Sequence, residues 1–409
     1  MRILVRSFGL VVLALITMSE AVEDVEALRS VWSSVDQFSS PFFQTAQEFI
    51  PGNLILSPVG INIDLAMISL GARGNTEAQF RNVLHLPTSE SLVTSGYQSL
   101  IDNLNSIKDN KLAVANKAFM ASGLNLKPSY KNLTEVYFRS SLQKVNFDRE
   151  RETADIINSW VEENTNHLVK EVVTAGKLNA RTRLVLVNAM YFKGQWKDKF
   201  DPELTKDMQF HTKDGPKSAS IMKREGKYKY GNVPDLNARF VVIPYKVDEL
   251  SMVIILPNKG INSDEYIRNI NLTNILSNGE KQIITLYLPK FKVESILDLG
   301  DILPEMGLSD AFSSHADFSG IADGNLDLSN VIQKAYIEVD EKGNTVSSSN
   351  SDDVEAVSRD SIMKFSDSVN TQFRINRPFY YYVIKTMEDA VGHDIHLQLF
   401  CGFVSEPKF

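Results

Sequence analysis

The first half of the chain repeats apolar residues at the spacing of amphipathic helices. Segments with this spacing cover residues 25–49, 61–70, 77–86 and 153–168. Pro41 is expected to interrupt the first of them, because proline removes a backbone donor from a helix. Thr153 is expected to cap the last of them, since a threonine hydroxyl can accept a hydrogen bond from a free N–H of the first turn.

The second half is rich in short runs of β-branched and aromatic residues, which is the composition of β-strands. After an early run at 53–56, such segments cover residues 184–192, 240–243, 252–256, 283–288 and 335–339. Several are apolar throughout, as expected for a sheet that is covered on both faces. Helices followed by strands, without a repeat or a low-complexity linker, predict a single α+β domain over residues 22–409.

A long polar stretch, residues 342–374, separates the strand at 335–339 from the next apolar run. A connection of roughly thirty residues is much longer than the ordinary limit of about 12–15 residues within a compact domain. It is therefore either functional or disordered, and the motifs around it are needed to decide.

The amino-terminal residues 1–21 have the layout of a secretory signal peptide. Two arginines flank the start of an apolar segment at 8–16, and small residues permit cleavage after Ala21. The mature chain is therefore expected to be secreted into the extracellular space. In a secreted protein Asn132 and Asn271 are candidate glycosylation sites, because each is followed by Leu-Thr in the acceptor pattern.

Composition narrows the functional classes further. The 409 residues are 43% apolar and carry a net charge of −8, which supports a large core and argues against a nucleic-acid partner. After the signal, no stretch approaches the ~18 uncharged apolar residues of a membrane span. Cys401 is the only cysteine, so no intramolecular disulfide can form, and its apolar neighbours predict a buried packing residue.

The sequence lacks the residue patterns that mark common catalytic and metal sites. It has no Gly-x-Ser-x-Gly nucleophile motif, no phosphate-binding loop and no Cys/His cluster. His393 and His396 lie three residues apart, but their apolar neighbours predict a strand, in which residues at this spacing face opposite sides. We therefore predict that the chain is not an enzyme and has neither a metal site nor a cofactor.

Five motifs that follow one another along the chain resemble those of one protein family. They are Asn-Leu-Ile-Leu-Ser-Pro at 53–58, Leu-Gly-Ala-Arg-Gly-Asn-Thr at 70–76, Asn-Ala-Met-Tyr-Phe-Lys-Gly-Gln-Trp at 188–196, Leu-Pro-Lys-Phe at 288–291 and Ala-Asp-Phe-Ser-Gly at 316–320. With the stretch from 335 to 379, they make nearly the whole chain after the signal similar to the serpins. The resemblance implies an α+β fold of three β-sheets and about nine helices, with a reactive loop exposed at one pole.

The resemblance also implies a function, which is inhibition of a serine endopeptidase by a suicide-substrate mechanism. The target protease attacks the loop and forms an acyl-enzyme. The cleaved loop then inserts into the main sheet as an extra strand and distorts the protease before it deacylates. The inhibitor, expected to be a monomer, supplies no catalytic group. The alternative is a non-inhibitory serpin that acts as a carrier, storage protein or protease-cleavable binding protein.

The same resemblance assigns roles to residues where the main sheet is expected to open. Lys290 and Glu341 would form an ion pair beside Trp196, and Glu341, Gly343 and Asn344 would form the hinge of the loop. The alternative for the ion pair is a marginal surface contact that contributes about 0–1 kcal/mol to stability.

Deeper in the sheet, Ser57 and Asn188 would join a hydrogen-bonded cluster that controls the separation of the central strands. Two positions depart from the usual pattern, since Gly60 stands where a serine is common and Gln333 where a histidine is common. The amide of Gln333 can both donate and accept, so the cluster is expected to be rewired through it.

Insertion of the loop requires that every second residue enter the core. If insertion begins at Asn344, the inward residues are Asn344, Val346, Ser348, Asn350, Asp352 and Val354. The two asparagines would cost about 1–3 kcal/mol each without partners, and a buried Asp352 carboxylate would take up a proton or stop the insertion. Gly343, the otherwise small residues and the absence of proline favour insertion.

The bond that the protease cleaves has more than one candidate. The nearly fixed spacing from the hinge glutamate in the family gives the bond between Val357 and Ser358, which suits elastase-like proteases. The bond between Arg359 and Asp360 suits trypsin-like proteases, whose specificity pocket is acidic. A third candidate lies further on, at 364–365.

Overall fold

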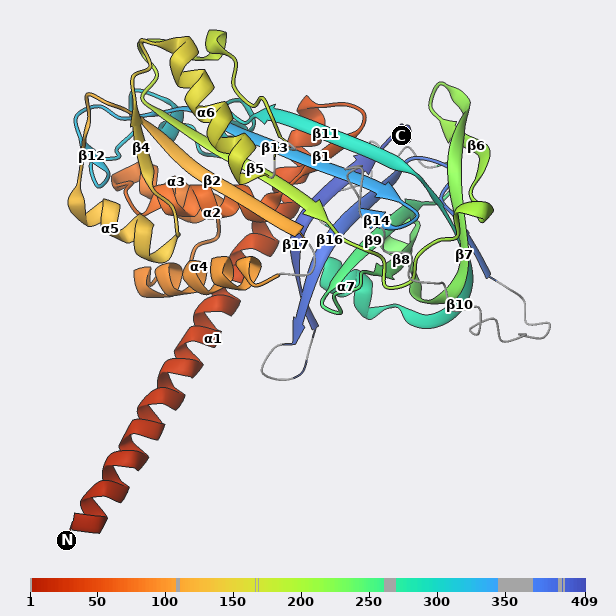
Figure 1. Ribbon diagram of the computed structural model, residues 1–409, viewed down its shortest axis with the longest axis horizontal. Coiled ribbons are helices and arrows are strands. Elements are labelled where there is room, and N and C mark those ends of the chain that lie inside the picture. Colours follow the sequence, from red (N-terminus) through yellow and green to blue (C-terminus); the bar gives the residue numbers. More distant parts are fainter. Residues whose placement is uncertain are drawn as a thin grey trace.

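The computed structural model describes residues 2–107, 111–165, 167, 169–260, 270–344, 371–388, 392 and 394–409. Over these residues the chain forms eight α-helices and three β-sheets (Figure 1), which confirms the predicted α+β fold. The helices are α1 (Arg2–Phe49), α2 (Pro58–Ser69), α3 (Gly74–Val83), α4 (Glu90–Asn105), α5 (Pro128–Tyr137), α6 (Glu150–Asn164), α7 (Leu272–Ser277) and α8 (Ile302–Glu305). Short 3₁₀ helices lie at Ala175–Lys177, Pro202–Leu204, Pro234–Leu236 and Asp310–Phe312.

The six-stranded sheet contains the two strands between which the loop is expected to insert. Its strands are, in spatial order, β11 (Phe291–Asp298), β13 (Leu328–Asp340), β5 (Leu184–Lys193), β2 (Lys111–Ala121) and β4 (Leu142–Val145), with β14 (Gly343–Asn344) on the end of β13. β13 and β5 run parallel, whereas β11 and β2 are antiparallel to the strands they flank. α6 packs over one face of this sheet through Ile157 and Val161, which join a cluster with Phe119, Val187 and Ile332.

The nine-stranded sheet supports the carboxyl-terminal side of the loop. Its order is β1 (Leu54–Leu56), β17 (Asp394–Val404), β16 (Phe379–Glu388), β9 (Leu250–Pro257), β8 (Ala238–Pro244), β7 (Gly215–Val233), β10 (Glu280–Pro289) and β15 (Thr371–Arg374), with β6 (Lys206–Thr212) paired to β7. β7 is 19 residues long, so it pairs with β6 near its start and with β8 near its end. The third sheet consists of β12 (Ala322–Asp323) and β3 (Asn125–Leu126).

α2 is buried along its whole length and contacts both β5 and β17. Most of its side chains are apolar, which places the helix in the core, and it starts with favourable terminal residues. Pro58 occupies its first turn, and Ser57 Oγ accepts a hydrogen bond from the backbone N–H of Gly60 at 3.3 Å. The helix therefore brings Ser57 and Gly60 beneath the central strands of the six-stranded sheet.

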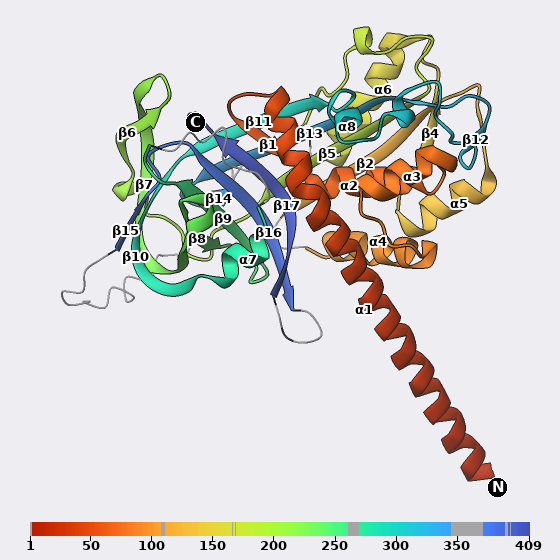
Figure 2. The ribbon, with the colours of Figure 1, turned by 180° about the vertical axis from the view of Figure 1, so that it is seen from behind.

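α1 continues through Pro41, so the predicted interruption is wrong. Phe38, Phe42 and Phe43 are buried around the proline, and their packing outweighs a lost backbone hydrogen bond and clash of about 3 kcal/mol. The first part of the helix extends away from the rest of the molecule, and its later part contacts β17 (Figures 1 and 2). Over the described residues, the helices lack the apolar length that crossing a bilayer requires.

α6 begins at Glu150, so the prediction that Thr153 caps it is also wrong. Arg149 occupies the cap position and makes no side-chain cap bond. The buried Thr153 hydroxyl instead donates to the carbonyl of Asn146 at 2.7 Å, which ties the helix to the preceding loop. Leu168, predicted on the same helix, lies outside the described residues.

Candidate functional site

β5 and β13 part at one end, and the chain that follows β13 folds back into the opening (Figure 1). The two strands pair in parallel as far as Tyr191 and Tyr336. Beyond this point β14 pairs with the last residues of β13 on one side, and Gly343 forms a bridge with Gln195 on the other. β14 is thus a short strand that lies between β13 and the continuation of β5.

Gly343 fits into this opening because it has no side chain. Its φ angle is +130°, in the region that favours glycine. A Cβ atom here would contact the carbonyl oxygen of Gly194 and would lie 2.8 Å from both Gln195 Cα and Trp196 N. These are backbone atoms, which cannot move aside as the end of a flexible side chain can. The predicted hinge glycine therefore stands where no other residue fits.

Asp340 and Trp196 hold the turn between β13 and β14. One carboxylate oxygen of Asp340 accepts hydrogen bonds from the backbone N–H groups of Lys342 and Gly343, at 2.7 and 3.1 Å. The indole N–H of Trp196 donates to the carbonyl of Asp340 at 2.9 Å, and its backbone N–H donates to the carbonyl of Lys342 at 3.0 Å. The indole is buried and stacks on Tyr245, with ring centroids 4.7 Å apart. These contacts fix the conformation of the hinge.

Glu341, in the same turn, lies against Lys290. Lys290 Nζ is 3.0 Å from Glu341 Oε2, and Thr205 Oγ1 donates to Oε1 at 2.8 Å. The Lys290 and Glu341 side chains are only 19% and 13% exposed, so water screens this pair less than it screens an ordinary surface contact. Burial alone would raise the pKa of Glu341, but hydrogen bonds from its own backbone, from Thr205 and from Lys290 outweigh burial and lower it.

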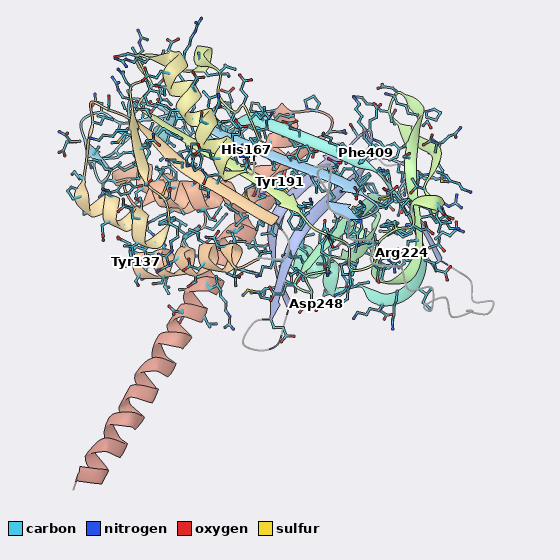
Figure 3. All side chains as sticks on the ribbon, viewed as in Figure 1. Tyr137, His167, Tyr191, Arg224, Asp248 and Phe409 are labelled. Carbon is cyan, nitrogen blue, oxygen red and sulfur yellow. The ribbon has the colours of Figure 1, made fainter. Side chains whose placement is uncertain are left out.

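Lys290 has a second neighbour, at the last residue of the sequence. The ring centroid of Phe409, labelled in Figure 3, lies 4.2 Å from Lys290 Nζ. The adjacent backbone is held by the N–H of Lys292, which donates to the carbonyl of Lys408 at 2.8 Å. An ammonium group over an aromatic face is attracted to it, so Phe409 stabilises the charge that also binds Glu341.

Gln333 connects β13 to β5 and to the residue before α2. Its Oε1 accepts from the backbone N–H of Ser57 at 3.0 Å, and its Nε2 donates to the carbonyl of Ser57 and to Asn188 Oδ1, both at 2.8 Å. All three residues are buried. The structure therefore brings Ser57, Asn188 and Gln333 into direct contact, and the Gln333 amide both donates and accepts.

Asn116 and Gly60 complete this cluster. Asn188 Nδ2 donates to Asn116 Oδ1, so side-chain hydrogen bonds run across β13, β5 and β2. A Cβ atom on Gly60 would collide with the side chain of Asn188 and with Met190 Sδ. The glycine therefore leaves the space that the Asn188 amide occupies.

Comparison with known proteins identifies the family. The family model described as "Serpin (serine protease inhibitor)" matches residues 33–407. The chain belongs to the serpin family. Its relatives include the antitrypsin of Bombyx mori, 32% identical over 353 residues, which covers 85% of this chain and 88% of that protein. The leukocyte elastase inhibitor of Sus scrofa is 35% identical over 321 residues, covering 75% and 85%.

Solved structures agree with this assignment. The structure of human thyroxine-binding globulin superposes with a TM-score of 0.81 at 26% identity and covers 94% of this chain and 100% of that one. Serpins are protease inhibitors and not enzymes, as predicted for this chain, and its relatives include inhibitors named for trypsin and elastase.

The reactive loop of this serpin is held at both of its described ends. It leaves the six-stranded sheet at Asn344 and joins the nine-stranded sheet at Thr371, where β15 pairs in parallel with β10. The residues of the two principal candidate bonds lie outside the described residues: Val357, Ser358, Arg359 and Asp360.

Both candidate glycosylation asparagines are on the surface of this serpin. Asn132 is exposed on α5. Asn271 is exposed at the start of α7, where its Oδ1 accepts from the backbone N–H of Asn274 at 2.9 Å. Each side chain is therefore within reach of solvent, although that of Asn271 also caps a helix.

Cys401 and His396 are both buried in β17. Burial raises the pKa of the Cys401 thiol and is the main reason that the pKa of His396 falls to about 4. His396 Nδ1 lies 3.0 Å from Thr386 Oγ1, and His393 lies outside the described residues. Within the part of the chain that the structure describes, no three His, Cys, Asp or Glu side chains form a group able to hold a metal ion.

Sequence reasoning missed Asp340, Thr205, Asn116 and Phe409. Asp340 has a local signal, because an aspartate just before a tight turn commonly accepts hydrogen bonds from the N–H groups that follow it. The other three have none. Their partners lie far away in the sequence, so only the fold reveals them.

Replacing Glu341 with glutamine should lower the apparent thermal midpoint at neutral pH by about 1–3 °C, because it removes a charge that Lys290 and Thr205 stabilise. The pKa of Glu341 is lower in the folded protein than its ordinary value of 4.5. The stabilisation is therefore complete above pH 4.5 and is lost as the pH falls through the folded pKa. Circular dichroism should show the midpoints of parent and variant converging in acid.

Lys290→Met supplies the control for this measurement. It should give a similar loss at neutral pH, and the double variant should lose no more than the larger of the two single losses. A difference between parent and Glu341→Gln that persists unchanged in acid would contradict the assigned role of the ion pair.

Proposed function

We propose that this chain is a secreted, monomeric serpin that inhibits a serine endopeptidase as a suicide substrate. The observation that carries the proposal is the position of β14. Both of its residues pair with β13, and Gly343 also forms a bridge with Gln195 in the continuation of β5. The residues that follow can extend this strand without moving its start. Relatives whose names state inhibition, the antitrypsin and the leukocyte elastase inhibitor, add support.

The covalent step uses the catalytic groups of the protease. Its serine oxygen attacks the carbonyl carbon before the cleaved bond, the peptide C–N bond breaks, and the leaving nitrogen takes up a proton. An ester then joins the two proteins. The segment after the cut stays attached through β15, which pairs with β10, whereas the segment before it is free to move into the sheet with the protease.

The register of β14 indicates where each inserted residue would lie. Asn344 pairs with Val339, and continuing this antiparallel register would bring Ser348 opposite Ala335. Val339 and Ala335 both belong to the main core. The alternate residues that start from Asn344 would therefore take the core-facing positions, as strand geometry requires.

Asn350 is expected to oppose insertion when only the sequence is considered, but it would meet a matching polar site. The same register would bring it opposite Gln333 on β13 and, through the bridge between Gly343 and Gln195, opposite Asn188 on β5. A strand that enters here breaks the hydrogen bond from Gln333 Nε2 to Asn188 Oδ1. The Asn350 amide can accept from Gln333 and donate to Asn188 in its place. Asn350 therefore favours insertion.

The mature chain, mixed with trypsin and with elastase, should form with one of them a complex that survives denaturing gel electrophoresis. The ester between the two proteins is the reason for this resistance. The mass of the released carboxyl-terminal fragment should identify its first residue as Ser358 or Asp360. Cleavage without a complex would make the loop a simple substrate of these proteases and would favour the non-inhibitory alternative.

Two neighbouring substitutions separate insertion from cleavage in this experiment. Val346→Glu introduces a charge at an inward position, and Thr345→Glu introduces the same charge at an outward one. The first should abolish the complex and leave cleavage intact, whereas the second should form the complex as the parent does. Equal behaviour of the two variants would contradict insertion in this register.

Asn350→Leu should reduce the stability that the serpin gains on loop cleavage, because one N–H of Gln333 Nε2 and the Asn188 Oδ1 acceptor would be left unpaired. Each polar group left unpaired costs about 1–3 kcal/mol. Guanidinium unfolding of the cleaved parent and variant measures the loss. Ser347→Leu is the matched control, because in the same register it would lie opposite the half-buried Tyr336 on the other face of the sheet and away from the cluster under α6. If cleaved Asn350→Leu is as stable as the cleaved parent, Asn350 does not bridge these two residues.

A non-inhibitory carrier is the second candidate function. In the register of β14, Asp352 would lie opposite Val331, which belongs to the apolar core, so its carboxylate would enter unpaired. The structural match to thyroxine-binding globulin, which was solved as a complex with its small-molecule ligand, also favours this function. A carrier of this kind would form no covalent complex and would gain no stability when its loop is cut.

Secretion rests on the signal pattern at 1–21 and can be tested in a eukaryotic secretory cell line. The chain should reach the medium with Val22 as its first residue, and an N-glycosidase should lower its mass. Asn132→Gln and Thr273→Ala should each remove part of this change; Thr273→Ala disrupts the acceptor pattern while keeping the Asn271 cap. Retention of the full-length chain inside the cells would contradict secretion.

A further inference from the structure

A pocket of about 470 Å³ lies where the β6–β7 turn faces the end of β17 and the segment between β15 and β16. This volume is within the roughly 300–1,000 Å³ that small-molecule sites occupy. Pro257, Pro378 and Phe403 give it an apolar lining. Its described lining residues include none from the hinge, the Lys290–Glu341 pair or the Gln333 cluster, so the pocket is separate from the site described above.

Arg377 is the half-buried cation of this pocket, and among the described residues it has no anionic partner. Its Nε donates to the carbonyl of Pro257 at 2.7 Å and its Nη1 to Asn376 Oδ1 at 3.2 Å, and both acceptors are neutral. A guanidinium has five N–H donors, so most of them remain available. Among the described residues, the ion pairs include neither Arg377 nor Arg239.

The surroundings of Arg377 favour the arrival of an anion. Partial burial, and then the like charge of Arg239, lower the pKa of Arg377 to about 10. Both effects disfavour the charged form of Arg377 when no anion lies beside it. A bound negative group would stabilise that charged form. Arg239 lies over the ring of Phe373, which is uncharged. This contact therefore supplies no negative charge to offset the two arginines.

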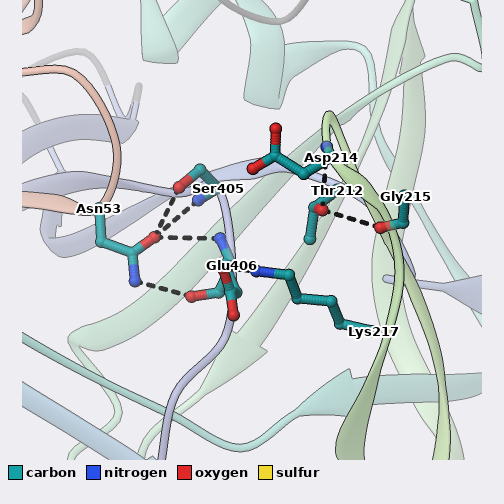
Figure 4. Close-up of polar contacts among 7 residues, drawn as sticks. All are labelled: Asn53, Thr212, Asp214, Gly215, Lys217, Ser405 and Glu406. Atoms are coloured by element: carbon teal, nitrogen blue, oxygen red, sulfur yellow. Dashed lines mark hydrogen bonds and ion pairs between the residues drawn. The ribbon is translucent and has the colours of Figure 1, made fainter.

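Glu406, at the rim of the pocket, already has a cationic partner. It forms an ion pair with Lys217 (Figure 4), and the hydrogen bond from Lys217 lowers the pKa of its carboxyl group. Asn53 fixes the backbone here, because its Oδ1 accepts from the N–H groups of Ser405 and Glu406 and its Nδ2 donates to the carbonyl of Glu406. This wall is preformed, and its carboxylate is occupied.

The opposite wall is the β6–β7 turn, which is also held by its own hydrogen bonds. Thr212 Oγ1 donates to the carbonyl of Gly215 at 2.8 Å and accepts from the backbone N–H of Asp214 at 3.3 Å (Figure 4). Among the described lining residues, Lys213 and Lys259 add exposed positive charge, and Asp214 is the one exposed acid. Preformed walls reduce the ordering that binding would require.

We propose that this pocket binds a small molecule that carries one carboxylate on an aromatic or aliphatic body. The carboxylate accepts hydrogen bonds from the free donors of Arg377, for which the planar guanidinium is well suited. The apolar body covers Phe403 and Pro378. Inorganic phosphate would pair with the charge of Arg377 but would not contact the apolar lining. An uncharged analogue would contact the apolar lining but would not pair with the charge.

Calorimetric titration of the full chain with phenylbutyrate, and with phenylbutanol as its uncharged match, tests the proposal. We expect the acid to bind at least about tenfold more tightly than the alcohol, and more tightly than inorganic phosphate. Equal affinity for acid and alcohol, stronger binding of phosphate, or no binding of the acid at millimolar concentrations overturns the proposal. No protease takes part, so this outcome is independent of whether the chain inhibits one.

Three substitutions test whether the carboxylate binds at Arg377. Arg377→Met should weaken the acid about tenfold and leave the alcohol unchanged. Lys217→Met should also weaken the acid, because it frees the Glu406 carboxylate to compete, whereas Glu406→Gln should strengthen it at low ionic strength. Lys217 is exposed and Glu406 half-buried at the surface, and lost folding would not shift acid binding in opposite directions for the two variants. Their effects therefore remain informative if Arg377→Met is unstable. Acid binding that none of these changes alters overturns the assignment.

Discussion

The lack of a side chain at Gly343 is the constraint on which the rest of the hinge depends. Its positive φ and its close contact with the backbone of Gly194 and Gln195 allow β14 to lie between two strands. A larger residue would displace Asn344 as well, and with it the register that positions each residue of an inserting loop. The hydrogen bonds of Asp340 and the Lys290–Glu341 pair hold the turn in place, but only the glycine leaves the space.

Two polar clusters have opposite effects on β5 and β13: the hinge keeps the two strands apart, and the Gln333 cluster holds them together. The hinge occupies the opening between β5 and β13 at one end, whereas Gln333 links the strands lower down through Asn188. The polar groups of Gln333 have partners, so the closed sheet has no unpaired amide to drive it open. An entering strand breaks one side-chain bond and gains backbone bonds along both edges, each worth about 0.5–1.5 kcal/mol net. Under the proposed mechanism, this balance would favour insertion once cleavage frees the loop.

The spacing of apolar residues predicted the helices and strands whose buried residues recur at one regular interval. It failed where contacts with residues far away in the sequence determine the structure. The apolar runs of β5 and β13 were visible in the sequence, as was the pairing of Lys290 with Glu341 through the family resemblance. Pro41 was misjudged because aromatic packing outweighs its helix-breaking effect. Gly60 and Gln333 stood out as departures from the family, yet only the fold shows that the Asn188 amide fills the space that a serine would need at position 60.

The length of β13 limits where a trapping loop can be cut. In the register of Asn344 with Val339, Asp353 would lie opposite Asn330. The register shift that follows would bring Val354 or Glu355 opposite Leu328, the first residue of β13. A protease attached before Glu355 would stop insertion while part of β13 is still unpaired. A protease attached far beyond Glu355 would be joined to the inserted strand by a long flexible segment. The bonds after Val357 and Arg359 follow Glu355 closely, whereas Lys364 is more distant. Under the proposed mechanism, cleavage at either of the nearer bonds would allow complete strand pairing with little chain to spare, so the length of β13 would favour these two bonds over the third.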